Sequence, residues 1–275
     1  MIDAKSFVPP PLRDLILIGG GHSHVQVIKR ISMKQIPGVR VTLISEDYDS
    51  AYSGMLPGCV ASTYTKDQIS IQLSALCSSA NVRFICAEVT GLDPDSKKIS
   101  LRGRSPVRYD TLSINAGGSP SLNRSVGINV KPINFFLPKW QAAVAEIGTQ
   151  KGKSSTLCIV GAGAGGVELA FAMRASLPPE TKIKLFGPKL LPGHGDRVER
   201  RVMKVLIEKK IDLIEKYFET DSDFHDDNEH VFWVTGTESP EWIKDSGLCI
   251  DDRGFIKVNK YLQSLSHSNV FAAGD

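Results

Sequence analysis

Two stretches of the chain repeat the same order of apolar strand, glycine-rich turn and helix. Residues 15–18 form a short, fully apolar run that ends in three glycines, which is typical of a buried parallel strand. Val25, Ile28 and Ile31 then follow at helical spacing. The apolar residues 39–44 supply a second strand, so this stretch of about 30 residues predicts one strand-helix-strand unit.

The second copy begins at residues 156–160, an apolar run that leads into Gly161. Apolar residues at helical spacing follow from Val167 and stop at Pro178, because proline cannot continue a helix. Residues 182–186 supply the next strand. The pattern therefore predicts a second strand-helix-strand unit of the same design.

The remaining apolar patterns predict short strands and two more helices. The predicted strands are residues 82–87, 98–101, 111–115, 211–218 and 230–234, and the predicted helices are residues 139–147 and 196–210. A length of 275 residues fits two domains, each large enough to bury a core of its own.

Composition and charge exclude several classes of protein. The chain is 41% hydrophobic and 23% charged, and its net charge of +3 comes from scattered Lys and Arg, so no nucleic acid partner is expected. No apolar stretch approaches the roughly 18 residues of a membrane span, and residues 1–14 match neither a signal peptide nor a transit peptide. The five cysteines are odd in number and widely spaced, which favours a reducing compartment, so a cytoplasmic location is expected.

The first glycine-rich turn has the residues that binding of a diphosphate requires. It consists of Gly19, Gly20, Gly21, His22, Ser23 and His24, all of them candidates for cofactor binding. Gly19 permits the tight turn, Gly21 lets a pyrophosphate approach the backbone, and the amides at the helix start attract that anion. His24 stands where a third glycine is expected, which relaxes the demand for close packing of the helix on the strand.

Acidic residues follow the second strand of this first unit. Glu46 and Asp47 lie where a carboxylate usually binds the ribose hydroxyls, and Ser45 is a weaker alternative for the same position. The alternative interpretation of the whole unit is a Rossmann-like domain that binds no nucleotide.

The second glycine-rich turn satisfies the full GxGxxG pattern between a strand and a helix. Its candidate cofactor-binding residues are Gly161, Gly163, Ala164, Gly165 and Gly166. Gly187, Pro188 and Lys189 follow the next strand, so no carboxylate is available there for a free ribose hydroxyl. A lysine tolerates the 2′-phosphate of NADP, so NADP is permitted and the choice between NAD and NADP stays open.

Three more apolar strands end in small residues and glycine. These strand ends add Ala116, Gly117, Gly236, Gly274 and Asp275 to the cofactor-binding candidates. The Asp275 carboxylate can accept hydrogen bonds from ribityl hydroxyls. No metal site is expected, because His22 and His24 are too few for a closed site and the acidic residues 221–229 lack the glycine of a calcium loop.

Taken in order, these motifs resemble those of the pyridine nucleotide-disulfide oxidoreductase superfamily. The letters GGGHSH, AYSGMLPG (residues 51–58) and GAGAGGVELA are most similar to type II NADH dehydrogenase relatives, in particular the flavoprotein module fused ahead of selenophosphate synthase. The resemblance implies an α/β fold of two Rossmann-like domains, the second inserted in the first and the whole truncated before a C-terminal interface domain. Residues 1–122 and 239–275 would bind FAD, and residues 123–238 would bind NAD(P)H.

The resemblance also implies roles for single residues. The first turn and Glu46 would hold the adenosine half of FAD, and Asp275 would hold its ribityl-pyrophosphate part. The second turn would hold NAD(P)H, and Ser53 is a further candidate for cofactor binding. Glu168 falls where relatives place a catalytic acid close to nicotinamide and flavin, although capping the helix in its first turn is an alternative role.

The implied activity is transfer of hydride from NAD(P)H to FAD and onward to a quinone or other small acceptor. Disulfide reductases of the superfamily carry a redox cysteine soon after the ribose acid, but no thiol stands at residues 50–57. Cys59 is the nearest thiol, and packing is its expected role. Two alternatives stay open, a disulfide or persulfide reductase that works through Cys59 alone and a non-catalytic flavin-binding module. The implied partners are a fused or separate selenophosphate synthase domain and, through a missing C-terminal region, a second copy of the chain.

Overall fold

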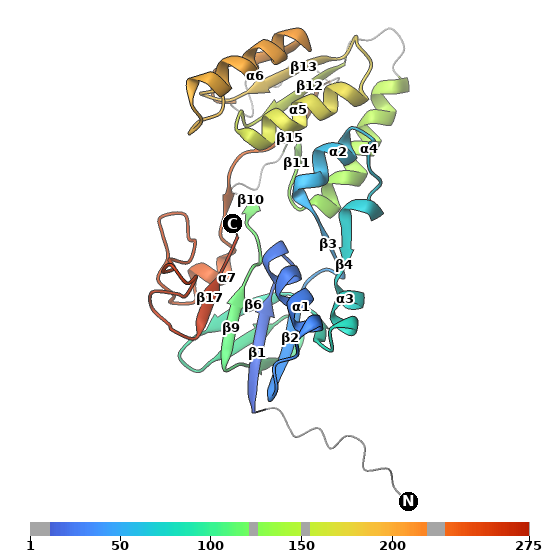
Figure 1. The fold of residues 1–275 in the computed structure, drawn as a ribbon. Helices are drawn as coiled ribbons and strands as arrows, with labels where there is room; N and C mark the ends of the chain where they lie inside the picture. The colour runs from blue at the N-terminus through green and yellow to red at the C-terminus, as the bar shows by residue number, and fades with distance from the viewer. Residues whose placement is uncertain (1–11, 121–125, 150–154, 219–228, 275) are drawn as a thin grey trace, which may run out of the picture. The chain divides into compact units, whose positions relative to one another are not determined.

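The computed structural model describes residues 12–120, 126–149, 155–218 and 229–274 (Figure 1). The chain clusters into two compact units. The first unit comprises Met1–Ser50, Ile71–Gly118 and Glu238–Asp275, and the second comprises Ala51–Ser70 and Ser119–Thr237. Each unit is built on a five-stranded parallel sheet.

The sheet of the first unit has the strand order β17-β9-β1-β2-β5. Its strands are β1 (Arg13–Ile18), β2 (Val39–Ser45), β5 (Arg83–Cys86), β9 (Thr111–Ile114) and β17 (Val270–Ala272). Because all strands are parallel, their carboxyl ends meet at one edge of the sheet, which is where ligands bind in open α/β folds.

Helices cover one face of this sheet. They are α1 (His22–Met33) and α3 (Leu73–Ser79), which contact each other. Val25, Ile28 and Ile31 recur at helical spacing on α1 and are buried in one core with sheet residues such as Leu17. The same period that predicted the helix therefore provides the face by which it packs.

A small antiparallel sheet and a short helix cover the other face. The small sheet consists of β6 (Val89–Asp93), β7 (Lys98–Leu101) and β8 (Arg104–Arg108), and the helix is α7 (Glu241–Lys244). Ile99 of β7 and Ile243 of α7 are buried in one core with Ile16 and Ile18 of β1. Since Ile16 and Leu17 are successive residues, they point to opposite faces of the sheet, and both faces are buried.

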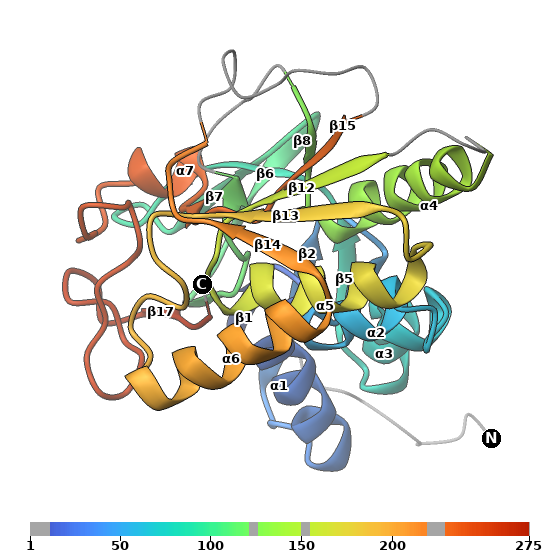
Figure 2. The ribbon, with the colours of Figure 1, turned by 90° about the horizontal axis from the view of Figure 1, so that it is seen from above.

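The sheet of the second unit has the strand order β11-β15-β12-β13-β14. Its strands are β11 (Ile128–Asn129), β12 (Thr156–Val160), β13 (Lys182–Phe186), β14 (Ile211–Ile214) and β15 (Glu229–Trp233). On one face lie α4 (Ile133–Thr149), α5 (Ala164–Ser176) and α6 (Asp196–Glu208), and Figure 2 shows α5 and α6 on the same side of β12, β13 and β14.

Aromatic rings cover the opposite face of that sheet. Phe218 lies with its ring centroid 4.8 Å from that of Phe186 and 5.4 Å from that of Trp233, both in edge-to-face geometry. All three side chains are buried in one cluster. Such pairs stabilise a core beyond the area that they bury, so among the described residues aromatic rings, and not a helix, cover this face.

Residues 51–70 were expected in the first domain but cluster with the second unit. They include the short helices η1 (Ser53–Met55), α2 (Leu56–Val60) and η2 (Asp67–Ile69). Leu56 and Val60 are buried in the core that α5 contributes to, and α2 contacts α5. Their burial explains why residues 51–70 group with the second unit.

Two short two-stranded sheets lie where the chain passes in sequence from one unit to the other. They pair β3 (Asp49–Ala51) with β4 (Ser70–Gln72) and β10 (Ser119–Pro120) with β16 (Thr237–Glu238).

The predicted α/β class with parallel sheets is confirmed, and the two predicted strand-helix-strand units occur as β1-α1-β2 and β12-α5-β13. The helix predicted at residues 139–147 is longer and includes Pro138. The strand predicted at residues 211–218 was too long, because the Lys216 N–H donates to the Ile214 carbonyl at 2.9 Å and turns the chain. Among the described residues, no helix is long and apolar enough to cross a membrane.

Candidate functional site

The first glycine-rich turn follows β1, and both its backbone conformation and its close contacts require glycine. Gly19 has φ +91°, a backbone conformation that other residues rarely adopt, and its N–H donates to the Ile44 carbonyl at 2.8 Å. A Cβ on Gly19 would lie 2.3 Å from the Asn115 carbonyl oxygen. Gly21 is the N-cap of α1, and a Cβ there would lie 2.1 Å from Asn115 Oδ1. The turn therefore touches the end of β9 with no room for side chains.

This turn presents backbone donors at a helix start. Within the described part of the chain, the amides of Gly20 and Gly21 donate to no acceptor, and both residues are partly exposed. They precede the amino end of α1, whose dipole favours an anion at that end. The amides of Gly20 and Gly21 therefore fit a diphosphate group, whereas the Gly19 N–H is already used within the fold.

Asn115 is the site residue that the sequence did not reveal. The residue is 7% exposed; its Oδ1 accepts from the Ser23 N–H at 3.2 Å and its Nδ2 donates to the Ala273 carbonyl at 2.6 Å. Its own N–H donates to the Ile18 carbonyl at 2.8 Å. The predicted ligand residue Ser23 therefore already uses its amide inside the protein. The available signal was a polar side chain directly after the apolar strand β9.

His24 lies beneath the turn and does not face its open side. The residue is 1% exposed; its Nδ1–H donates to the Gly19 carbonyl at 2.7 Å, and its Nε2 accepts from the Ser113 hydroxyl at 2.8 Å. Burial lowers the pKa of His24 to about 4, so the ring is neutral at neutral pH. The expected relaxation of packing at the missing third glycine is wrong, because the imidazole fills that position. His22, the other predicted histidine, is half-buried at the first position of α1.

Carboxylates follow β2, as the sequence predicted. Glu46 and Asp47 are exposed directly after the strand. Although Glu46 is largely exposed, partial desolvation of its carboxyl group raises its pKa, the nearby Glu88 and Asp47 raise that pKa further, and Arg102 lowers it. Arg102 also forms an ion pair with Glu88. Either carboxylate stays a candidate for the ribose hydroxyls.

The ends of β9 and β17 line a cavity of about 160 Å³ within the first unit. Its walls include Ala116, Gly117 and Gly274 together with apolar side chains; these are Ile114, Ile243, Phe255, Ile256, Val258 and Leu262. The Ser239 hydroxyl also lines the cavity; it is buried and has no hydrogen-bond partner among the described residues. Three predicted residues thus adjoin one cavity, whereas Asp275 lies outside the described residues.

The second glycine-rich turn is packed more tightly than the first. Gly161 has φ +125°, and a Cβ on it would lie 2.7 Å from the Val234 carbonyl oxygen. A Cβ on Gly166 would lie 1.7 Å from the Gly161 carbonyl oxygen. The third glycine of the pattern is therefore required by the contact between helix and turn.

The open side of this turn also presents amides. Gly163 is the N-cap of α5, and a Cβ on it would meet nothing within 4 Å. Ala164 and Gly165 are exposed, and in the described residues their amides donate to no acceptor. The geometry therefore fits an anion at the amino end of α5.

No carboxylate follows β13. The Gly187 N–H donates to the Ile214 carbonyl at 3.2 Å, and Pro188 and Lys189 are exposed. Gly236, which follows β15, is exposed as well. The arrangement permits a 2′-phosphate beside Lys189, as the sequence predicted.

Two further predicted residues lie outside the two turns in the sequence, on α5 and in η1. Glu168 is exposed on α5 beyond its first turn, so the alternative role as a first-turn helix cap is wrong. Ser53 is exposed in η1, within the second unit. The Cys59 thiol of α2 is partly buried against the core, and burial raises its pKa. All five cysteines are described, and none is bonded to another.

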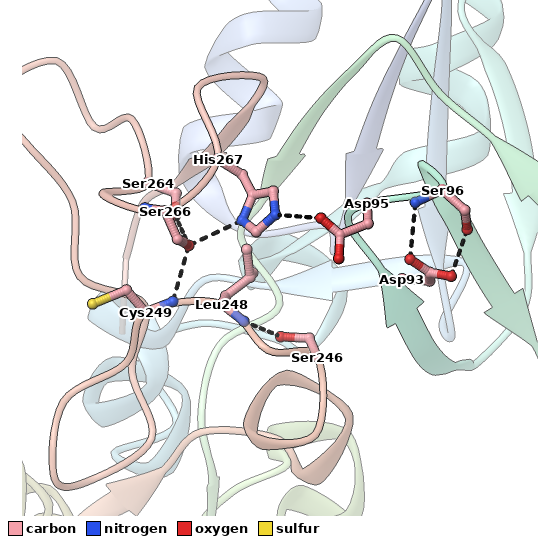
Figure 3. A network of polar contacts seen from close by, with 9 residues as sticks. All are labelled: Asp93, Asp95, Ser96, Ser246, Leu248, Cys249, Ser264, Ser266 and His267. Atoms are coloured by element: carbon pink, nitrogen blue, oxygen red, sulfur yellow. Dashed lines mark hydrogen bonds and ion pairs between the residues drawn. The ribbon is translucent and has the colours of Figure 1, made fainter.

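A further polar cluster in the first unit combines serine, histidine and aspartate (Figure 3). His267 Nε2–H donates to Asp95 Oδ1 at 3.3 Å, and its Nδ1 accepts from the Ser266 hydroxyl at 3.0 Å. Ser266 Oγ also accepts from the Cys249 N–H at 3.0 Å. The Asp95 side chain is 94% exposed, so solvent competes for this pair. The cluster ties the turn after β6 to the loop before β17. In the described residues, no group of His, Cys, Asp and Glu is placed to hold a metal ion.

Comparison with known proteins assigns the family. The family model for pyridine nucleotide-disulphide oxidoreductases matches residues 13–275. The NADH dehydrogenase-like protein YutJ of Bacillus subtilis is 23% identical over 280 residues, which are 96% of this chain and 76% of that protein. The demethylphylloquinone reductase NdbB of Synechocystis is 23% identical over 288 residues, which are 95% of this chain and 71% of that protein.

Among solved structures, NDH2 of Plasmodium falciparum in complex with NADH matches with a TM-score of 0.78 and 17% sequence identity. The match covers 96% of this chain and 64% of that chain, and at this identity the likeness concerns the fold. The family model covers nearly the whole chain. The chain therefore belongs to the pyridine nucleotide-disulphide oxidoreductase family and is an oxidoreductase that uses FAD and NAD(P)H.

Proposed function

We propose that the first unit binds FAD, that the second unit binds NAD(P)H, and that hydride passes from the nucleotide to the flavin and onward to a small acceptor of the quinone type. One observation carries the proposal. Both glycine-rich turns end at a helix amino terminus beside amides that have no acceptor in the described residues, and both lie at the carboxyl edge of a parallel sheet.

The residues of the first unit fit the parts of FAD. The Gly20 and Gly21 amides would bind the diphosphate, and Glu46 or Asp47 would accept from the adenosine ribose hydroxyls. Neutral His24 supports the turn from beneath without adding charge to it. When bound, FAD supplies a ring that accepts hydride and passes electrons on.

The residues of the second unit fit a pyridine nucleotide. The Ala164 and Gly165 amides would bind its diphosphate, and Lys189 would face a 2′-phosphate when NADPH is the donor. We propose Glu168 as the acid near the reacting rings, on the strength of the family resemblance. Its exposed position on α5 leaves its side chain accessible to a bound nucleotide.

A quinone-like acceptor is supported by the relative that is named a demethylphylloquinone reductase. The disulfide or persulfide alternative requires a nucleophilic thiolate. Cys59 is partly buried and its pKa is raised, which reduces the thiolate fraction at neutral pH. The structure thus offers this alternative no support from the thiol nearest to the expected position.

The proposal extends to a partner, a selenophosphate synthase domain. The letters GGGHSH and AYSGMLPG support a flavoprotein module that works with a selenophosphate synthase domain in the cytoplasm, as a separate or fused partner. The non-catalytic alternative predicts FAD binding without nucleotide oxidation, so the same experiment distinguishes the two.

The test uses purified protein reconstituted with FAD. We expect bound-flavin absorbance that bleaches when NADH or NADPH is added without oxygen and returns when a soluble quinone follows. The variant Gly163→Asp should stay yellow and resist bleaching by the nucleotide, because its carboxylate repels the diphosphate in open space where the fold is not disturbed. Dithionite should still bleach it. Protein that binds no FAD would refute the proposal, and flavin that no nucleotide reduces would favour the non-catalytic module.

A further inference from the structure

We propose that Asn115 is the positioning residue of the FAD diphosphate turn, holding the start of α1 and the Ala273–Gly274 backbone in register through a single side-chain amide. The inference rests on the proposed function, since it assumes that FAD binds at this turn. Asn115 itself is not proposed to touch the cofactor.

Asn115 connects three segments that are remote in sequence. Oδ1 accepts from the Ser23 N–H, 92 residues away, and Nδ2 donates to the Ala273 carbonyl, 158 residues away. Its backbone N–H donates to the Ile18 carbonyl at the end of β1. Both side-chain functions are therefore used, and each contacts a different wall of the site.

The surrounding glycines make room for this one amide. A Cβ on Gly21 would lie 2.1 Å from Oδ1, and a Cβ on Gly274 would lie 2.4 Å from Nδ2. Gly274 also has φ +90°. The two glycines belong to segments that are far apart in the sequence, and both pack against the buried side chain of Asn115. A larger residue at Gly21 or Gly274 would displace Asn115, so the packing of the three residues is interdependent.

The geometry also determines which amides are left for the cofactor. Because Asn115 Oδ1 occupies the Ser23 N–H, the Gly20 and Gly21 amides, which precede the helix, remain as donors that have no acceptor in the described part of the chain. The asparagine amide is neutral, so it caps α1 without cancelling the positive potential at the helix start. An aspartate would make the same cap but would bring a negative charge to the place where a diphosphate binds.

In the described residues, the second unit shows no counterpart of this arrangement. The Gly165 N–H holds the place in α5 that the Ser23 N–H holds in α1, and it donates to no acceptor there, while a Cβ on Gly163 would meet nothing within 4 Å. A readout from the NAD(P)H turn is therefore an internal control for the effect of Asn115 on the FAD turn.

The test is the pH dependence of FAD affinity in the variant Asn115→Asp. Apoprotein is titrated with FAD between about pH 5 and pH 8.5, with flavin fluorescence as the readout. When the introduced carboxyl is protonated, it can both donate to Ala273 and accept from Ser23, so affinity at acid pH should approach that of the wild type. The ionised carboxylate loses the donor and repels the diphosphate, so affinity should fall at least about tenfold toward high pH.

Three further measurements make the result specific. The wild type carries His22 and His24 on the same turn, so its own pH profile is the baseline. Asn81→Asp adds an equal charge at an exposed position of the first unit and should follow the wild type. Asn115→Ala, which needs no new space, should bind FAD about tenfold more weakly at every pH while NADH affinity, measured by the quenching of its fluorescence, stays unchanged.

The outcomes separate the two hypotheses. If the wild-type apoprotein binds no FAD, the proposed function fails. If the wild type binds FAD while Asn115→Asp shows the wild-type pH profile, or Asn115→Ala keeps the wild-type affinity, the positioning role of Asn115 is overturned and the proposed function stands.

Discussion

The two glycine-rich turns are built from the same strand-turn-helix plan but solve its packing problem differently. In the second turn, Gly166 lets α5 approach so closely that a Cβ would overlap the Gly161 carbonyl. In the first turn, His24 occupies the corresponding position, and its imidazole fills the space and hydrogen-bonds to the Gly19 carbonyl. In the second turn the helix packs directly on the turn because Gly166 has no side chain. In the first turn the buried side chain of His24 fills the space between them.

The difference teaches that the glycine pattern describes one solution to a more general requirement. The requirement is that no empty space remains between the carbonyl of the first glycine and the following helix, and that buried polar groups there have hydrogen-bond partners. Backbone contact meets it in the second unit, and in the first the His24 ring meets it by donating to the Gly19 carbonyl and accepting from the Ser113 hydroxyl. The two turns should therefore respond differently to substitution and to pH.

The largest effect is expected for Gly166→Ala. The added methyl would lie 1.7 Å from the Gly161 carbonyl oxygen, and a backbone atom cannot yield as a flexible side chain can. We expect a loss of about 3 kcal/mol or more in the free energy of unfolding, measured by urea denaturation, together with loss of NADH binding. The matched control is Gly165→Ala, whose methyl would meet Val234 Cγ1 at an ordinary 3.7 Å. Equal stability of the two variants would contradict the tight contact.

The next effect is the acid sensitivity of the first turn. His24 has a pKa of about 4 in the folded protein and about 6.5 when unfolded. The folded pKa is depressed, so the unfolded state binds the extra proton between these values. The stability that His24 contributes is fully present above about pH 6.5 and is lost as pH falls toward 4, by roughly 2 kcal/mol at pH 5.

The measurement is a series of urea unfolding curves between pH 7.5 and pH 5. The variant His24→Gln removes the titrating group, so its stability should lack this component of the pH dependence even if it is lower overall at neutral pH. A wild type and a variant that lose stability in parallel would show that His24 is not the buried base that the geometry indicates.

Much of the fold could be predicted because its signals are local. The apolar runs, the helical spacing after each turn and the glycines themselves lie within a few residues of the structures that they specify. The candidates Lys189 after β13 and Glu46 after β2 rest on the same kind of local signal, and their roles stay predictions. The roles of Asn115 and His24 could not be predicted, since the partners Ser23, Ala273 and Ser113 lie far away in the sequence and meet them only in the folded sheet.

The grouping of residues 51–70 escaped prediction for a similar reason. Leu56 and Val60 give a short apolar pattern that does not reveal which core it joins. Only the burial of α2 in the core shared with α5 decides it. Short elements carry little of their own periodicity, so tertiary packing determines their place.

A smaller effect is expected at the edge of the second turn for Lys189→Glu. The lysine is exposed after β13, where a 2′-phosphate would lie in the proposed complex. Reversing its charge should weaken NADPH relative to NADH by about tenfold, without a change in stability. The ratio of kcat/KM for the two nucleotides measures this, with Lys182→Glu, on the exposed start of β13, as the control for charge alone. An unchanged ratio would remove Lys189 from the nucleotide site.

The smallest effect is expected for Cys59→Ser, which tests whether the Cys59 thiol packs in the core or takes part in the redox reaction. The side chain is partly buried on α2 and contributes to the core of the second unit. A hydroxyl in its place should cost about 1 kcal/mol of stability, because a polar group replaces a weakly polar one. NADH-dependent quinone reduction should keep a rate within about twofold of the wild type, because hydride passes through the flavin without a thiol. Loss of turnover with intact flavin binding would instead make Cys59 the reacting group and favour the persulfide reductase alternative.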